Sequence, residues 1–317
     1  MRIAIADNNN KKFTGDIINH WESLGHEVRF ETGASEKLAQ WADIYWIDTW
    51  DNNIHYLWKL YHGVDGVSRT DPWDNNKKPL IIVRALDWEV WIGLMRDQAI
   101  IDWVDKIVFI ADHIKEKVNQ EVKISNDKQR VIKPGVNLDR FTLKSKQTDG
   151  FQLGMVLGDM WKYKNHIGGL DIFTSLYQKD NRWRLHVRGQ HENSMYDPAN
   201  WNYYLDSRGI REAVTLYGHQ NNMNEWLENI DVMLHPGQKE AFCYAIGEAM
   251  AKNIPVFIND FLGSQNIWPF SLLYETHEEV IHKLNDNQIL NFNYREYIQK
   301  YYSNERMFKE IDEFINL

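Results

Sequence analysis

Residues 232–259 read VMLHPGQKEAFCYAIGEAMAKNIPVFIN, and the order of elements in this stretch decides the fold. The apolar run at 232–236 predicts a buried strand that ends in a Pro-Gly turn. The pattern at 241–251 predicts a helix, and the apolar run at 254–259 predicts a second strand. A strand, a helix and a strand in this order predict two parallel strands with the helix packed across them.

The same alternation of strands and helices extends along the chain and breaks once. The polar stretch FTLKSKQTDG at 141–150 has no apolar periodicity and is therefore the expected linker. We predict an α/β fold with two Rossmann-like domains, at 1–145 and 146–296, and a C-terminal helix at about 297–317 that packs back on the first domain. Further strands are expected at 2–6, 26–30, 42–49, 78–86, 105–111, 151–157, 183–189 and 213–218, of which those at 42–49, 78–86 and 105–111 are expected to be buried.

Composition limits the classes of function. A chain of 317 residues exceeds what one hydrophobic core normally serves, and its net charge of −9 argues against a non-specific nucleic-acid platform. The single cysteine, Cys243, excludes an internal disulfide and a multi-cysteine zinc site. No stretch reaches the ~20 apolar residues of a membrane span. We expect a cytoplasmic protein without a transmembrane segment.

Glu240 and Glu248 stand eight positions apart in the opening stretch. If one helix carried both, they would lie ~12 Å apart along its axis and ~80° around it. A nucleotide-sugar has similar dimensions between its hexose hydroxyls and its ribose. The pair is therefore either a clamp for such a ligand or two solvated charges on an ordinary helix.

HPGQKEAFCYAIGEAMAKNIPVF (235–257) resembles the donor-binding signature of glycosyltransferase family 4, a group of retaining enzymes with the GT-B fold. The resemblance covers most of residues 100–275 and is weak before residue 95. The other segments that carry it are DKIVFIADHIKEKV (105–118), VIKPGVNLDRF (131–141), LGDMWKYKNHIGGLDIF (157–173) and NDFLGSQNIWP (259–269).

The resemblance implies two Rossmann-like domains whose parallel sheets face each other across a cleft. It implies a retaining, metal-independent enzyme that moves a sugar from a nucleotide-diphosphate donor to an acceptor hydroxyl. Glu240 would hold the sugar hydroxyls, Glu248 the ribose, and Lys164 the diphosphate. The implied catalytic residues are Lys164, Glu240 and Asp87, and the implied donor-binding residues are Glu240, Ala241, Phe242, Glu248, Lys164, Lys162, Gly158 and Gly237. No metal or other cofactor is expected, and the acceptor, whether glycan, small molecule, lipid or modified base, is unknown.

The sequence departs from the family pattern at two places. Asp159 stands where the family usually has a second diphosphate-binding arginine, and VRALDWEVW (83–91) has no histidine where the first domain often offers one. Arg84 or Asp87 is the expected substitute. Two alternatives therefore stay open, namely an enzyme that glycosylates modified nucleic-acid bases and a catalytically inactive scaffold that binds nucleotide-sugars.

Three further groups have structural interpretations. His235 precedes a proline at a strand end and is expected to be a structural histidine. Asp48 and Asp51 follow a strand and are expected to cap a helix rather than bind a metal. Cys243 is expected to pack in the core.

Overall fold

The computed structural model describes residues 1–9, 11, 13–64, 78–158, 162–189, 198–218, 222–285 and 291–317. The chain divides into two compact units. The first comprises residues 1–135 and 304–317, and the second comprises residues 136–303. Within the described residues, none of the helices has the length and apolar character needed to cross a membrane.

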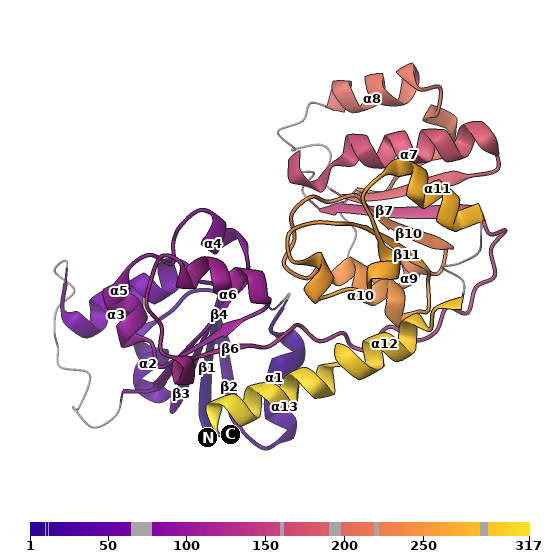
Figure 1. The fold of residues 1–317 in the computed structure, drawn as a ribbon. Coiled ribbons are helices and arrows are strands. Elements are labelled where there is room, and N and C mark those ends of the chain that lie inside the picture. Colours follow the sequence, from indigo (N-terminus) through magenta and orange to yellow (C-terminus); the bar gives the residue numbers. More distant parts are fainter. Residues whose placement is uncertain are drawn as a thin grey trace. The chain divides into compact units, whose positions relative to one another are not determined.

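The first unit is a parallel six-stranded sheet covered by helices (Figure 1). The strand order is β2-β1-β3-β4-β5-β6, and β3 is buried along its whole length, as expected for a strand covered on both faces. The strands are β1 Arg2–Asp7, β2 Glu27–Glu31, β3 Ile44–Asp48, β4 Leu80–Ala85, β5 Lys106–Phe109 and β6 Gln129–Val131. The helices are α1 Gly15–Ser23, α2 Glu36–Trp41, α3 Asn52–His62, α4 Trp88–Trp91, α5 Gln98–Trp103, α6 Asp112–Asn119 and α13 Asn304–Ile315.

Helix α13 completes the first unit although it lies at the end of the chain. It runs beside α1 (Figure 1), and its buried Ile311 and Phe314 belong to the same apolar cluster as Ile17 and Trp21. Asp312 accepts hydrogen bonds from the indole of Trp21 at 3.0 Å and from His20 at 2.8 Å. The C-terminal residues are therefore part of the core of this unit.

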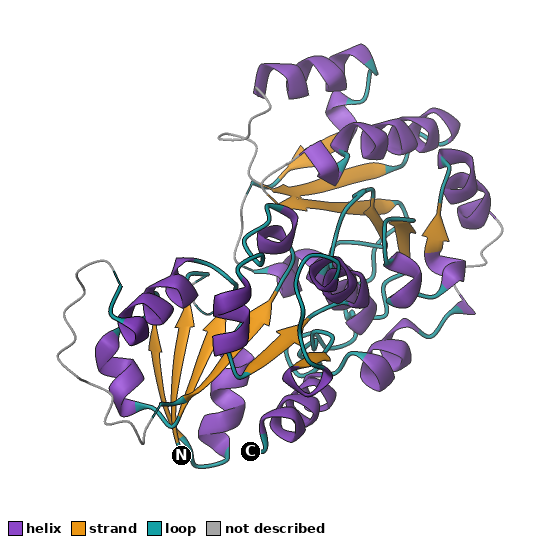
Figure 2. Cartoon of the chain, turned by 60° about the vertical axis from the view of Figure 1, so that its left-hand side comes forward, coloured by secondary structure: helices purple, strands orange, loops and turns teal. Residues whose placement is uncertain are grey.

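The second unit repeats the architecture with another parallel six-stranded sheet, in the order β12-β11-β10-β7-β8-β9. Helices lie on both of its faces (Figure 2). Apolar residues of α9, α10 and α12 form one core cluster, and those of α7, α8 and α11 form another. The strands are β7 Gln152–Gly158, β8 Arg184–Gly189, β9 Val214–Leu216, β10 Val232–His235, β11 Val256–Asn259 and β12 Leu273–Tyr274. The α-helices are α7 His166–Lys179, α8 Pro198–Ser207, α9 Met223–Leu227, α10 Tyr244–Ala251, α11 His277–Asn285 and α12 Tyr294–Tyr301.

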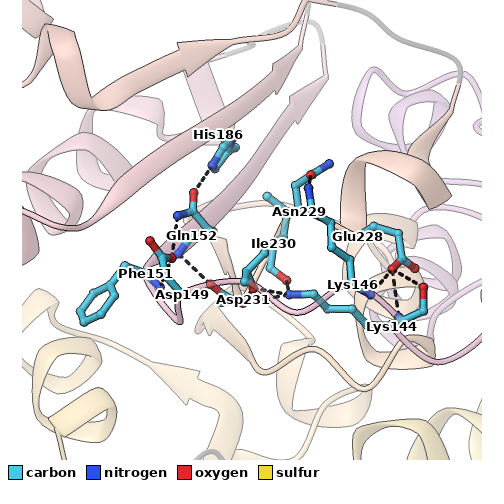
Figure 3. A network of polar contacts seen from close by, with 12 residues as sticks. Lys144, Lys146, Asp149, Phe151, Gln152, His186, Glu228, Asn229, Ile230 and Asp231 are labelled. Atoms are coloured by element: carbon cyan, nitrogen blue, oxygen red, sulfur yellow. Dashed lines mark hydrogen bonds and ion pairs between the residues drawn. The ribbon is translucent and has the colours of Figure 1, made fainter.

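The stretch predicted as a linker is held against the second unit. Lys144 donates to the carbonyl of Ile230 at 2.7 Å and forms an ion pair with Asp231 at 2.8 Å (Figure 3). The Glu228 carboxylate accepts from the backbone of Ser145 and Lys146, each at 2.9 Å. These contacts explain why residues 136–145 group with the second unit, whereas the sequence prediction assigned them to the first.

The periodicity at 297–317 predicted one helix, but the structure has two. The chain leaves the helical path at Tyr302 and Ser303, where the Tyr302 carbonyl accepts from the Val136 N–H at 2.7 Å and Ser303 pairs with Val136. Helix α12 packs on α10 in the second unit, and α13 belongs to the first. Apolar spacing alone did not show this break.

Candidate functional site

The residues singled out in the second unit gather where its strands end. Strands β10 and β7 are neighbours in the sheet, with Leu234 opposite Met155. The loops that follow them therefore leave the same edge side by side, as in other open α/β sheets whose ligands bind at the carboxyl ends of the strands. One loop carries Glu240 and the other carries Lys164.

Lys164 and Glu240 form an ion pair across these two loops. Glu240 is buried, at 8% exposure, and the Lys164 side chain is 20% exposed. Burial is the largest single influence and would lower the pKa of Lys164, but the charge and hydrogen bond of Glu240, together with Cys243 and Tyr163, raise that pKa above its ordinary value. The ammonium is therefore charged at every physiological pH and lies where an anion would meet it.

His235 lies beneath this pair at the end of β10. Its Nδ1 is 3.5 Å from the Cys243 sulfur and its Nε2 is 3.7 Å from a Glu240 oxygen. Burial, together with the charge of Lys164, lowers the pKa of His235 to about 3, so the imidazole is neutral. Burial also raises the pKa of Cys243 to about 12, which keeps the thiol protonated. Neither group has the properties of a base or nucleophile at neutral pH, which agrees with their structural interpretation.

His235, Glu240 and Cys243 are also the described residues that could hold a metal ion, since their ligand atoms lie within 4.8 Å of one another. Nitrogen, oxygen and sulfur ligands of this kind suit a zinc-like cation. A cation there would compete with the Lys164 ammonium for the carboxylate.

Two glycines lie in the turns that carry these groups, and each has a different reason to be a glycine. Gly158 ends β7 in a left-handed conformation with φ of 57°, and a Cβ on it would lie 4.0 Å from Lys164 Cε. A Cβ on Gly237 would lie 2.7 Å from His235 Nε2 and 3.6 Å from a Glu240 oxygen. A side chain at position 237 would therefore displace the imidazole, whereas its distance to the carboxylate is an ordinary contact.

Helix α10 begins at Tyr244, three residues after the predicted start at 241, so the two glutamates do not share a helix. Cys243 precedes it in a left-handed conformation, φ 64°, which interrupts the helical pattern that the apolar spacing suggested. Glu240 therefore lies in the loop and Glu248 on the second turn of α10. The calculated helical angle between them does not apply, although both remain in the segment that leaves β10.

The other predicted donor-site residues occupy different environments. Ala241 and Phe242 are buried, at 3% and 2% exposure, and the Phe242 ring lies 5.1 Å from that of Trp268. They shape the loop from the core side. Lys162 starts a 3-10 helix at Lys162–Lys164, but its side chain and all of Asp159 lie outside the described residues.

Asp87 and Arg84 belong to the first unit. Asp87 is the N-cap residue of α4 and is partly exposed. Arg84 is buried, forms an ion pair with Asp48 at 2.6 Å and donates to the carbonyl of Phe13. Asp51 caps α3 by accepting from the Asn53 N–H at 2.8 Å, so the capping prediction is confirmed for this residue.

One charged residue of the same sheet edge was missed. Arg188 is the last residue but one of β8 and is 7% exposed. Its guanidinium lies 2.7 Å from the Met223 sulfur and 5.7 Å from the Trp226 ring centre. The signal was present in WRLHVRG, where an arginine stands in a strand predicted to be buried. Buried arginines are uncommon and call for a partner.

Part of the second unit resembles a known protein family. Residues 143–267 match the family model of glycosyl transferases group 1. The comparison with curated proteins yields no match.

Solved structures match almost the whole chain at low identity. A sucrose-phosphate synthase from Thermosynechococcus elongatus has a TM-score of 0.74 at 13% identity, covering 99% of this chain and 98% of that one. A glycosyltransferase from Rickettsia africae has 0.70 at 14%, with coverage of 99% and 98%. The Anabaena protein HepE, solved in complex with UDP, has 0.71 at 11%, with 99% of each chain covered.

The two parallel sheets and these neighbours define the GT-B fold, and the chain is a glycosyltransferase. The region that matches the family model of glycosyl transferases group 1 lies within its second unit.

Proposed function

We propose that this enzyme transfers a sugar from a nucleotide-diphosphate donor to an acceptor hydroxyl, with retention of configuration, as a member of glycosyltransferase family 4. The observation that carries the proposal is the buried ion pair of Lys164 with Glu240 at the adjoining ends of β7 and β10. It holds a cation and a hydroxyl-binding carboxylate together, and Glu248 follows on α10.

The chemistry assigns each group a step. The bond between the anomeric carbon and the diphosphate oxygen breaks, and its electron pair leaves with the nucleotide diphosphate. The acceptor oxygen bonds to the anomeric carbon and loses its proton. Negative charge therefore grows on the leaving diphosphate, and a fixed ammonium such as that of Lys164 stabilises it most in the transition state. This role requires no metal.

Glu240 would accept hydrogen bonds from the donor sugar, and Glu248 from the ribose hydroxyls. Because Lys164 and Glu240 pair with each other in the ligand-free chain, the donor has to share or replace that contact. Asp87, in the first unit, would take the role of the histidine that the first domain often offers in the family. HepE and other neighbours were solved with UDP, which supports a nucleotide diphosphate as the leaving group. We place the enzyme in the cytoplasm, where such donors are made.

The first experiment is a thermal-shift screen with UDP, GDP, ADP and their common sugar conjugates, because a ligand that binds only the folded state raises its stability. Release of nucleotide diphosphate from the stabilising conjugate then tests turnover. A shift with one nucleotide family that disappears in Glu248→Ala supports the donor site. No shift with any of them would contradict it.

A catalytically inactive donor-binding protein is the second candidate, because Asp159 replaces a diphosphate-binding arginine of the family. A carboxylate near a diphosphate is unfavourable. This candidate predicts a thermal shift with the donor and no release of nucleotide diphosphate, with or without acceptors.

A further inference from the structure

Arg188 is a buried cation to which the proposed transfer assigns no role. Its guanidinium contacts a sulfur and an indole ring, and among the described residues Arg188 forms no ion pair. Burial lowers the pKa of Arg188, and the charge of Glu248 partly opposes that effect. Burying a guanidinium without an oxygen partner is costly, so such a residue is expected to meet one in a complex.

The guanidinium is held in place but is not completely shielded from solvent. The Met223 sulfur and the Trp226 ring, both on α9, fix its position on one side. The described chain has several buried polar atoms without partners, and no nitrogen of Arg188 is among them. Its remaining N–H groups therefore reach solvent from a fixed position.

The order of strands shows which part of the donor would meet Arg188. The sheet runs β10-β7-β8. Glu240 follows β10, Lys164 follows β7, and Arg188 lies near the carboxyl end of β8. Strands lie about 4.8 Å apart, which puts β8 about 10 Å from β10. A donor laid along this edge has its sugar at Glu240, its diphosphate at Lys164 and its nucleoside at Arg188.

Lys164 and Arg188 are influenced by different glutamates. Lys164 is influenced by Glu240 and Cys243, whereas Arg188 is influenced by Glu248, the carboxylate proposed to hold the ribose. Glu248 also influences Cys243. Of the two glutamates, Glu248 is therefore the one whose charge reaches Arg188, at the nucleoside end of this edge.

We infer that Arg188 reads the base of the donor nucleotide by donating hydrogen bonds to a carbonyl oxygen, which selects uracil or guanine over adenine. A guanidinium only donates. Uracil and guanine present carbonyl oxygens, whereas adenine presents an amino group at the corresponding edge. This inference rests on the proposed donor site and adds a specificity residue to it.

The test compares the affinities of UDP, GDP and ADP by isothermal titration calorimetry in the wild type, Arg188→Met, Arg188→Lys and Arg184→Met. Arg184 lies at the opposite, exposed end of β8 and is the matched control. We expect the wild type to prefer UDP or GDP to ADP. Arg188→Met should bind the preferred nucleotide, UDP or GDP, about 10- to 100-fold more weakly, while its affinity for ADP changes little. Hydrogen bonds to charged groups contribute a free energy of about this size. Arg188→Lys should recover part of the loss, and Arg184→Met should match the wild type.

Other outcomes overturn the inference in distinguishable ways. An equal loss for all three nucleotides in Arg188→Met would mean that the residue acts on the diphosphate or on the fold. A wild type that prefers ADP would exclude carbonyl recognition. If the folded wild type binds none of the three, the proposed donor site itself fails. If Arg188→Met does not fold, Arg188→Lys still decides, because it keeps the charge and loses the planar fork.

Discussion

The ammonium of Lys164 and the carboxylate of Glu240 form an ion pair that joins the loop after β7 to the loop after β10. Both side chains are largely buried, and His235 beneath them is neutral. The pair therefore sets both the charge and the position of the two groups on which the proposed transfer depends. Each of them can be tested separately.

Replacing Lys164 by Met should lower the rate of nucleotide diphosphate release by about 100-fold or more, because a fixed charge that meets the leaving group is lost. Steady-state release of the nucleotide diphosphate from the donor measures this. Lys179→Met, at the exposed end of α7, is the control and should be unchanged. A folded Lys164→Met enzyme with wild-type turnover would remove Lys164 from the mechanism.

Glu240 and Glu248 should differ in what they recognise. Glu240→Gln should weaken the nucleotide-sugar by about tenfold and leave the free nucleotide diphosphate almost unaffected, because only the conjugate carries the hydroxyls that Glu240 binds. Glu248→Gln should weaken both ligands alike, since both carry the ribose. Calorimetric titration of each ligand into each variant measures the difference. Equal losses in Glu240→Gln would place that carboxylate at the nucleotide instead.

The buried strands of both sheets could be predicted from sequence because each is a short apolar run. Strands β6 and β12 were missed, and each is only two or three residues long, too short for periodicity to show. The two-domain α/β fold was correctly predicted, since alternating strands and helices leave few other arrangements.

Neither the start of α10 nor the contacts that hold residues 141–150 against the second unit could be predicted from the spacing of apolar residues. The apolar spacing around Cys243 predicted a continuous helix. Cys243 instead has a left-handed φ, which is rare for a residue with a side chain and which spacing does not reveal. Arg188 could be seen in the sequence as a charge in a buried strand, but its place beside Glu248 depends on the strand order. The roles of the donor-site residues remain predictions.

Asp231 should contribute more to stability than an exposed acidic residue. It pairs with Lys144 at 2.8 Å and accepts from the Gln152 N–H at 3.0 Å (Figure 3). Asp231→Ala leaves that largely buried ammonium without its carboxylate, so we expect a loss of about 1–3 kcal/mol in the free energy of unfolding. Asp180→Ala removes an exposed pair with Arg182 and should cost less than about 1 kcal/mol. Urea denaturation measures both, and equal effects would show that the Lys144 contacts do not anchor the segment.

Glu89 should make the stability of the first unit depend on pH. The carboxyl is fully buried on α4, where one oxygen accepts from the Leu86 N–H at 2.6 Å and the other has no hydrogen-bond partner among the described residues. Burial raises the pKa of Glu89 from 4.5 to about 7. The folded state thus binds the proton more tightly than the unfolded chain does. The associated stability is complete below pH 4.5 and is lost as the pH rises through 7.

Glu89→Gln replaces the carboxyl by a neutral group of similar shape and should remove this dependence. The variant should match the wild type near pH 5 and exceed it at pH 8 by about 1–3 kcal/mol in the free energy of unfolding, since one pKa unit corresponds to about 1.4 kcal/mol. Urea denaturation of the full chain from pH 5 to 8 measures the difference. Glu116→Gln, on the exposed face of α6, should follow the wild-type profile. Parallel profiles for wild type and Glu89→Gln would show that the Glu89 carboxyl is ionised in the folded chain across this range.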